Sequence, residues 1–211
     1  MHIDEPGAAQ QFGLGAFSSG EQVPHRYQQL EDFRVPSGFR GRSKICVELW
    51  WLVQATLFAL SPQAMYSWRA LLLRLFGARI GRQTIIRPSV RIPYPWKLTI
   101  GDYSHIGDEV HLYTYGEIEI GDRVVVSQRS YICTGSHDYT SPTFDLFAKK
   151  IVIEAEAWVA MDVFVAPGVT IGRGAVVGAR SSVFHDVPPG TISMGTPARV
   201  VGKRTIRATD R

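Results

Sequence analysis

The fold of this protein is decided by residues 153–183, which read IEAEAWVAMDVFVAPGVTIGRGAVVGARSSV. Every sixth position in this stretch is a branched aliphatic residue, and the same spacing recurs in shorter runs back to residue 80. Ile, Leu and Val make up roughly a quarter of ordinary chains, so an unbroken phase of six is improbable by chance. The aliphatic positions are Ile80, Ile86 and Ile92; Ile100, Ile106 and Leu112; Ile120, Val126 and Ile132; and Ile153, Val159, Val165, Ile171, Val177 and Val183.

A period of six fits neither an α-helix nor a flat strand, whose faces repeat every ~3.6 and ~2 residues. It fits a solenoid in which each hexad supplies a short strand and a corner, and three hexads close a triangular coil. We therefore predict a mainly-β fold, a parallel β-helix of about five coils with the aliphatic column inside. Four residues after each aliphatic position the side chain is small or β-branched, with Trp96 as the large exception. Glycine follows the aliphatic residue where tight corners favour a residue without Cβ, at Gly81, Gly101, Gly107, Gly121, Gly172 and Gly178.

Composition indicates an ordinary globular protein. Hydrophobic residues are 45% and charged residues 20% of the 211 residues, which excludes a disordered chain. A net charge of +4 is too small an excess to predict nucleic-acid binding. The two cysteines, Cys46 and Cys133, have no metal-ligand spacing, so we expect reduced thiols in a cytoplasmic protein.

The segment before the repeat, residues 1–79, is predicted to be a tail followed by a helical cap, and residues 80–211 form the β-helix domain. Met1–Gly20 is polar and glycine-rich without the pattern of a secretory signal, and we expect a mobile tail. Residues 45–60 follow three basic residues, read ICVELWWLVQATLFAL and end at Ser61-Pro62. This segment is too short to span a bilayer, which takes about 20 apolar residues.

A second, amphipathic helix is predicted from Met65, Trp68, Leu72 and Leu75, with Gly77 as its C-cap. Two interpretations of residues 45–60 fit the composition. The helix could pack on the open end of the solenoid, which has to be covered, or it could dock on the inner face of a membrane. We expect packing, and membrane association stays an alternative.

The repeat is interrupted three times, at residues 93–97, 117–119 and 137–150. A solenoid needs no interruptions, and functional sites are usually built on loops. The longest excursion, residues 137–150, begins within CTGSHDY at residues 133–139. The chain then re-enters the coil at Ile151, just before the hexad that contains Trp158.

These motifs resemble the hexapeptide-repeat acyltransferases over Ile80–Arg204. Within that family, CTGSHDY and the entry LLLRLFGARIG at Leu71–Gly81 look like the colanic-acid-type exopolysaccharide acetyltransferases of the sugar O-acetyltransferase branch. The resemblance implies a left-handed β-helix that works as a homotrimer and transfers acetyl from acetyl-CoA to a saccharide hydroxyl in exopolysaccharide biosynthesis, with no metal.

His137 is the predicted general base, because imidazole titrates near neutral pH and the SHD sequence stands at the mouth of the excursion. Asp138 could orient the imidazole or the acceptor, or it could be a turn residue. The resemblance places an acceptor contact one coil earlier, where this chain has Thr114 in place of a more usual asparagine.

For the donor, the resemblance implies a groove between subunits that holds the pantetheine arm, with cations against the phosphates. His185 stands where a lysine is usual. The predicted donor residues are Trp158, Ala160, Met161, Gly178, Ala179, His185, Arg199 and Lys203.

Three alternatives stay open from the sequence. A zinc-dependent β-helix carbonic anhydrase needs three histidines, and His105, His111 and His137 would supply them if the first two shared a face. A non-catalytic β-helix scaffold is the second. A serine acetyltransferase is the third, although it usually has a large helical N-terminal domain and only two short helices are predicted here.

Overall fold

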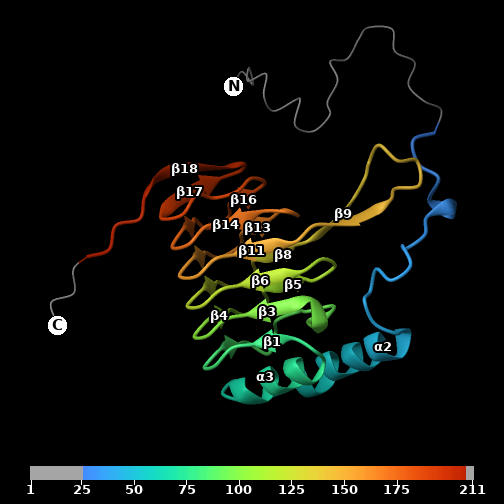
Figure 1. Ribbon diagram of the computed structural model, residues 1–211, viewed down its shortest axis with the longest axis horizontal. Coiled ribbons are helices and arrows are strands. Elements are labelled where there is room, and N and C mark those ends of the chain that lie inside the picture. Colours follow the sequence, from blue (N-terminus) through green and yellow to red (C-terminus); the bar gives the residue numbers. More distant parts are fainter. Residues whose placement is uncertain (1–25, 208–211) are drawn as a thin grey trace, which may run out of the picture.

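Short strands stacked along one axis form the body of the molecule, with helices across one end (Figure 1). The computed structural model describes residues 26–207, so the expected tail, Met1–Gly20, lies outside the described residues. The N-terminal elements are η1 (Leu30–Asp32), α2 (Lys44–Val53), η2 (Gln54–Phe58) and α3 (Tyr66–Leu75).

Three sheets form the sides of the solenoid. The first contains β1 (Arg79–Ile80), β3 (Leu98–Ile100), β6 (Ile118–Ile120), β11 (Ile151–Ile153) and β14 (Thr170–Ile171). The second contains β2 (Ile85–Ile86), β4 (His105–Ile106), β7 (Val125–Val126), β12 (Trp158–Val159), β15 (Val176–Val177), β17 (Thr191–Gly195) and the antiparallel β18 (Ala198–Lys203). The third contains β5 (His111–Tyr113), β8 (Tyr131–Cys133), β13 (Phe164–Val165) and β16 (Ser182–Val183).

The predicted β-solenoid is confirmed, and five coils are followed by the start of a sixth at β17. The sequence prediction of about five coils omitted this last turn because residues 184–203 lack the period of six. The excursion forms its own hairpin, in which β9 (Gly135–His137) pairs with β10 (Leu146–Ala148). The interruption at residues 93–97 contains η3 (Pro95–Lys97).

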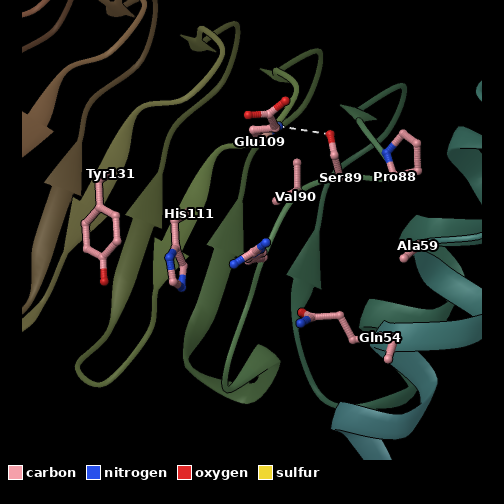
Figure 2. A pocket seen from close by; sticks show the side chains of 10 residues that line it. Gln54, Ala59, Pro88, Ser89, Val90, Glu109, His111 and Tyr131 are labelled. Carbon is pink, nitrogen blue, oxygen red and sulfur yellow. Dashed lines mark hydrogen bonds between the residues drawn. The ribbon is translucent and has the colours of Figure 1, made fainter.

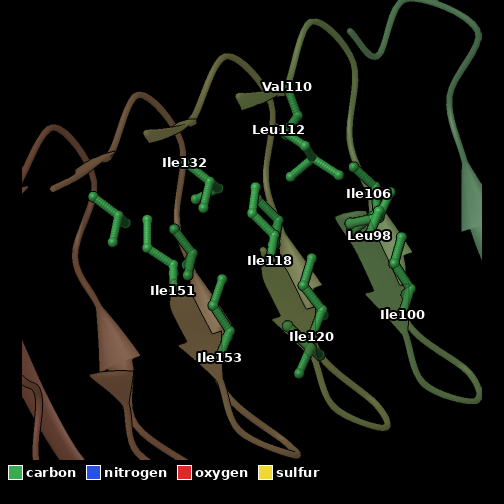
Figure 3. Close-up of a cluster of buried hydrophobic side chains, with 14 of the residues drawn as sticks. Leu98, Ile100, Ile106, Val110, Leu112, Ile118, Ile120, Ile132, Ile151 and Ile153 are labelled. Atoms are coloured by element: carbon green, nitrogen blue, oxygen red, sulfur yellow. The ribbon is translucent and has the colours of Figure 1, made fainter. Parts of the chain in front are cut away.

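The predicted aliphatic column forms the core in register. Ile80, Ile100, Ile120, Ile153 and Ile171 are successive Cα partners along the first sheet, and the other two sheets follow the same rule. All the aliphatic positions named above are at most 8% exposed. Figure 3 shows that the side chains from successive coils point into the same interior space. Each buried Val, Ile or Leu stabilises the fold by about 1.5–3 kcal/mol.

The glycines after the aliphatic positions are required by the close approach of successive coils. A Cβ on Gly121 would lie 2.6 Å from the backbone nitrogen of Ala155 and 3.0 Å from its Cα. The left-handed backbone of the same corner occurs two residues later and is occupied by a non-glycine residue, Arg123, with φ of 55°. Distance between coils, rather than backbone conformation, therefore selects glycine at this position.

The helices cover the first coil and share its core. Trp50 and Phe58 are fully buried, and the Trp50 indole Nε1 donates to the carbonyl of Ile92 at 2.6 Å. Arg69 of α3 is also fully buried, where its Nε donates to the carbonyl of Ile86 at 2.6 Å and its other nitrogens donate to Ser61 Oγ and two carbonyls. Burial lowers the pKa of Arg69. Between residues 26 and 207, no helix has both the length and the apolar character needed to cross a bilayer.

Replacing Gly121 with alanine tests the packing between coils. Gly121→Ala places a methyl group against backbone atoms that belong to the next coil, so we expect a loss of about 1–3 kcal/mol in the free energy of unfolding. Denaturant unfolding followed by circular dichroism measures this change. Gly202→Ala is the matched control, because a Cβ there meets no atom within 4 Å. Equal stabilities for the two variants would show that the coils do not need this close approach.

Candidate active site

Five of the predicted donor residues line one hollow on the outer surface of the second sheet. The hollow has a volume of about 500 Å³, and these residues are Trp158, Ala160, Met161, Gly178 and Ala179. They come from successive coils, and the parallel register places β12 beside β15. The sequence analysis missed the other residues of its lining, which are Ser127, Gln128, Val176, Ile192 and Met194.

Trp158 forms an aromatic wall of this hollow. Its side chain points outward from β12, and its indole Nε1 donates to Ser127 Oγ at 3.0 Å. Ile192 and Met194 belong to β17, which continues the second sheet beside β15. The period of six has ended before β17, so the repeat offered no way to place these two residues.

Arg199 of β18 stands beside the hollow, as the antiparallel partner of the lining residue Met194. Lys203, at the other end of β18, is the partner of Thr191, which does not line the hollow. Both side chains are exposed to solvent. His185 is also exposed, but it lies in the loop after β16 and does not line the hollow.

His137 lies in the excursion hairpin, with its imidazole held on two sides. Its Nδ1 is 2.7 Å from the carbonyl oxygen of Phe144, and the two rings are stacked with centroids 4.2 Å apart. A carbonyl only accepts, so Nδ1–H is the donor and the neutral ring has its lone pair on Nε2. Phe144 has a left-handed φ of 55°, which turns the backbone between the two strands of the hairpin.

The N-terminal segment also contacts this imidazole, which the sequence analysis missed. The Phe33 ring lies 5.8 Å from the His137 ring. The backbone N–H of Gln29 donates to the carbonyl of Pro142 at 2.7 Å, so residues 29–33 lie along the excursion (Figure 1). No repeat or motif marks this segment in the sequence.

Asp138 is a turn residue in this structure. Its carboxylate accepts from the backbone N–H and the hydroxyl of Thr140, at 2.9 and 2.6 Å. The side-chain hydrogen bond from Thr140 lowers the pKa of Asp138. Of the two interpretations open from the sequence, the structure favours the turn.

Thr114 does not reach the surface, so the expected contact with an acceptor has to be corrected. The residue is fully buried, and its hydroxyl accepts from the backbone N–H of Tyr94 at 2.8 Å. The neighbours Tyr113 and Tyr115 stack on each other with centroids 4.0 Å apart. Gly135 packs against Tyr115, since a Cβ on this glycine would lie 2.9 Å from Tyr115 Cβ. These tyrosines adjoin the point where the excursion leaves the coil.

Cys133 is the cysteine nearest to His137 in sequence, and its surroundings make its thiol a poor nucleophile. Burial raises the pKa of the Cys133 thiol, and Sγ donates to the carbonyl of Gly135 at 3.1 Å. The thiolate is the reactive form of cysteine, so the raised pKa makes Cys133 unsuited to accept the acetyl group.

The predicted shared face of His105 and His111 is wrong. His105 lies on β4 of the second sheet and His111 on β5 of the third, because one hexad turns one corner of the triangle. Within the described residues, no group of three or more His, Cys, Asp or Glu side chains could hold a metal ion. The arrangement on which the zinc alternative depended is therefore not present in this part of the chain.

Within one chain, the predicted base His137 does not lie in the donor hollow. The hollow is lined from the second sheet and its corners, and no residue of the excursion contributes to it. The excursion leaves the solenoid after β8 of the third sheet and returns at β11 of the first.

These features define an acyltransferase built on a β-solenoid. The chain is 61% identical over 177 residues to WcaF of Escherichia coli (strain K12), which is named for an acetyltransferase role in colanic acid biosynthesis. This match spans 84% of the chain and 97% of the relative. The chain therefore belongs to the hexapeptide-repeat acetyltransferases, and it is an acetyltransferase.

Solved structures agree with this assignment. The hexapeptide-repeat acetyltransferase VCA0836 of Vibrio cholerae, in complex with acetyl-CoA, has a TM-score of 0.70 at 28% identity and covers 77% of this chain and 89% of its own. A maltose O-acetyltransferase of Clostridium difficile 630 has a TM-score of 0.66 at 25% identity, covering 78% and 90%. The chain matches no family model.

A second hollow, of about 740 Å³, lies between η2 and the outer surface of the third sheet (Figure 2). Its lining includes Arg91, Glu109, His111 and Tyr131, and none of the predicted site residues. His111 packs against the Tyr131 ring at 4.6 Å between centroids. Burial, and then the positive charge of Arg91, lower the pKa of His111 to about 4.

The lowered pKa of His111 predicts that this residue reduces the free energy of unfolding at acidic pH. Between about pH 6.5 and pH 4 the unfolded chain binds a proton on this imidazole that the folded chain does not, so stability falls as pH falls. We expect His111→Gln to flatten part of this loss, measured by urea unfolding at several pH values in the window. His105→Gln, at an exposed histidine, is the control and should keep the wild-type slope. Parallel slopes for wild type and His111→Gln would contradict the assignment.

Proposed function

We propose that this protein transfers an acetyl group from acetyl-CoA to a hydroxyl of a sugar in the biosynthesis of a colanic-acid-type exopolysaccharide. The observation that supports it most is the convergence of Trp158, Ala160, Met161, Gly178 and Ala179 on one hollow. The relative that matches along almost its whole length is named for colanic acid biosynthesis.

The hollow suits the donor. Small side chains leave space, and Trp158, Met161 and Met194 provide an apolar surface for a pantetheine arm. Arg199 and Lys203, on the neighbouring β18, would meet the nucleotide phosphates, which both cations bind well. The VCA0836 structure supports this use, because it contains acetyl-CoA on the same fold.

In this proposal His137 is the general base. Its Nε2 takes the proton of the sugar hydroxyl while that oxygen attacks the thioester carbonyl, and the C–S bond then breaks. The same nitrogen returns the proton to the departing thiolate, so the products are an acetyl ester and free CoA. The carbonyl of Phe144 keeps the proton of His137 on Nδ1. The Phe144 ring stacks on the imidazole and fixes its plane.

The acetyl group passes directly to the sugar in this scheme. A two-step route through a cysteine would need a thiolate close to His137, and the buried Cys133 favours the protonated thiol. On the acceptor side, the half-buried Tyr113 and Tyr115 lie beside the excursion, where a sugar could contact their exposed edges. The Tyr115 ring is stacked against Tyr113 and against Tyr94, so its faces are covered.

We further propose that the working site is shared between subunits of a homotrimer. In a single chain, His137 does not line the donor hollow. A site with both the base and the donor therefore needs the excursion of one subunit to lie beside the hollow of the next. A cyclic trimer repeats this head-to-tail contact three times and closes it.

Replacement of His137 tests the reaction and its base together. Wild-type protein incubated with acetyl-CoA and an acceptor saccharide should add one acetyl group, detected by mass spectrometry. His137→Ala should lose transfer by about 10²-fold or more, as removal of a general base does, and still bind acetyl-CoA. Asp138→Asn, which keeps an oxygen for Thr140, should stay near the wild-type rate. Unchanged turnover of His137→Ala would exclude it as the base.

Mixing two inactive variants tests the shared site. Ala179→Trp fills the hollow from an exposed position, and His137→Ala lacks the base. When the two chains are co-expressed in equal amounts, about a quarter of the sites in random trimers combine an intact base with an intact hollow. We expect acetyl transfer to return to about that fraction of the wild-type rate. Restoration is absent if each chain builds its whole site alone, and a monomer by light scattering also contradicts the proposal.

A further inference from the structure

The helical layer at the end of the solenoid has apolar side chains that are largely exposed to solvent. On α2, Ile45, Leu49 and Leu52 recur at helical spacing and are 81%, 51% and 61% exposed. Val47 and Trp50 lie on the opposite side of the same helix and are fully buried. The helix therefore has two apolar faces, and the solenoid covers only one of them.

The neighbouring helix repeats this arrangement. Leu71 and Leu75 of α3 are exposed, while Arg69 and Leu73 on its other side are fully buried. Both helices bury one side against the first coil, so their outer sides point away from the solenoid at its end (Figure 1). We call Ile45, Leu49 and Leu52 of α2, with Leu71 and Leu75 of α3, the outer helical face.

Exposed basic residues lie at one margin of this face, where α2 begins. Glu48 of α2 is also exposed and lines the same surface as Ile45, Leu49 and Leu52. Arg42 and Lys44 are exposed at the N-terminus of α2, whose first turn has no acidic residue. Basic residues at a helix N-terminus oppose the helix dipole, so they do not serve the stability of α2. They add to the positive potential at this end of the molecule.

We propose that the outer helical face docks on the surface of an anionic lipid bilayer. Protruding aliphatic side chains with basic residues at the margin are the pattern of helices that lie in the membrane interface. Each basic residue near an anionic surface strengthens such binding by about fivefold. A second copy is a poorer occupant, because the same basic margins would meet each other.

This proposal does not depend on the proposed reaction. Packing on the solenoid and docking on lipid use opposite sides of α2, so both interpretations of residues 45–60 hold together. The donor hollow and the proposed acceptor residues Tyr113 and Tyr115 lie on later coils, and the outer helical face shares no residue with them.

Sedimentation with vesicles tests the proposal on the full chain. Vesicles of equal parts phosphatidylcholine and phosphatidylglycerol should sediment the protein at about 0.15 M salt, and pure phosphatidylcholine should sediment much less. Ile45→Gln with Leu52→Gln should weaken binding to anionic vesicles by at least about tenfold. Arg42→Gln with Lys44→Gln should weaken it and reduce its dependence on salt.

The matched control is Val201→Gln with Ile206→Gln, which removes apolar side chains of similar exposure, 61% and 86%, far from the helices. It should bind vesicles like the wild type. Circular dichroism and acetyl transfer to a soluble saccharide show whether each variant is folded, independently of lipid. Absence of binding to anionic vesicles overturns the proposal. Self-association in light scattering that disappears in Ile45→Gln/Leu52→Gln, without vesicle binding, would assign the face to a second copy instead.

Discussion

Register between stacked coils is the constraint on which the rest of this structure depends. Each aliphatic residue of one coil sits on the aliphatic residue of the next, as Ile100 does on Ile120 and Ile120 on Ile153. A slip of one residue would turn this column outward and bring a side chain in place of Gly121 against the backbone of Ala155. The two requirements act on adjacent positions, so they lock the coils together.

The same register explains how an otherwise uniform solenoid forms a site. Trp158 lies beside Val125 and Val176 on the second sheet, so one column of outward positions becomes the wall of a hollow. The excursion can grow out only where the register is interrupted, and β11 resumes pairing with β6 as though residues 134–150 were absent. His137 is therefore free of the hexad pattern, and its position is determined by Phe144 and Phe33 instead.

The sequence was sufficient to predict the parts that repeat. The fold, the buried column and five residues of the hollow follow from the period and from the resemblance it supports. Contacts made by non-repeating segments were not predictable: Met194 joins the hollow through β17, and Phe33 reaches His137 from the N-terminal segment. Thr114 was misjudged because its hydroxyl meets the backbone of Tyr94, and the sequence has no signal for this contact. The histidines His105 and His111 were placed on one face although a hexad turns a corner.

The end of the solenoid poses a separate physical problem. An open coil exposes apolar side chains, so repeat proteins close their ends with elements whose outer side is polar. Here α2 and α3 close the first coil well, with Trp50 bonded to Ile92 and the buried Arg69 bonded to Ile86. Their outer side remains apolar, with Ile45 and Leu75 largely in solvent. Only the inner sides of α2 and α3 are needed to close the first coil. Exposed leucines lower the solubility of a protein, so the apolar outer sides of these helices indicate a contact with something outside the chain.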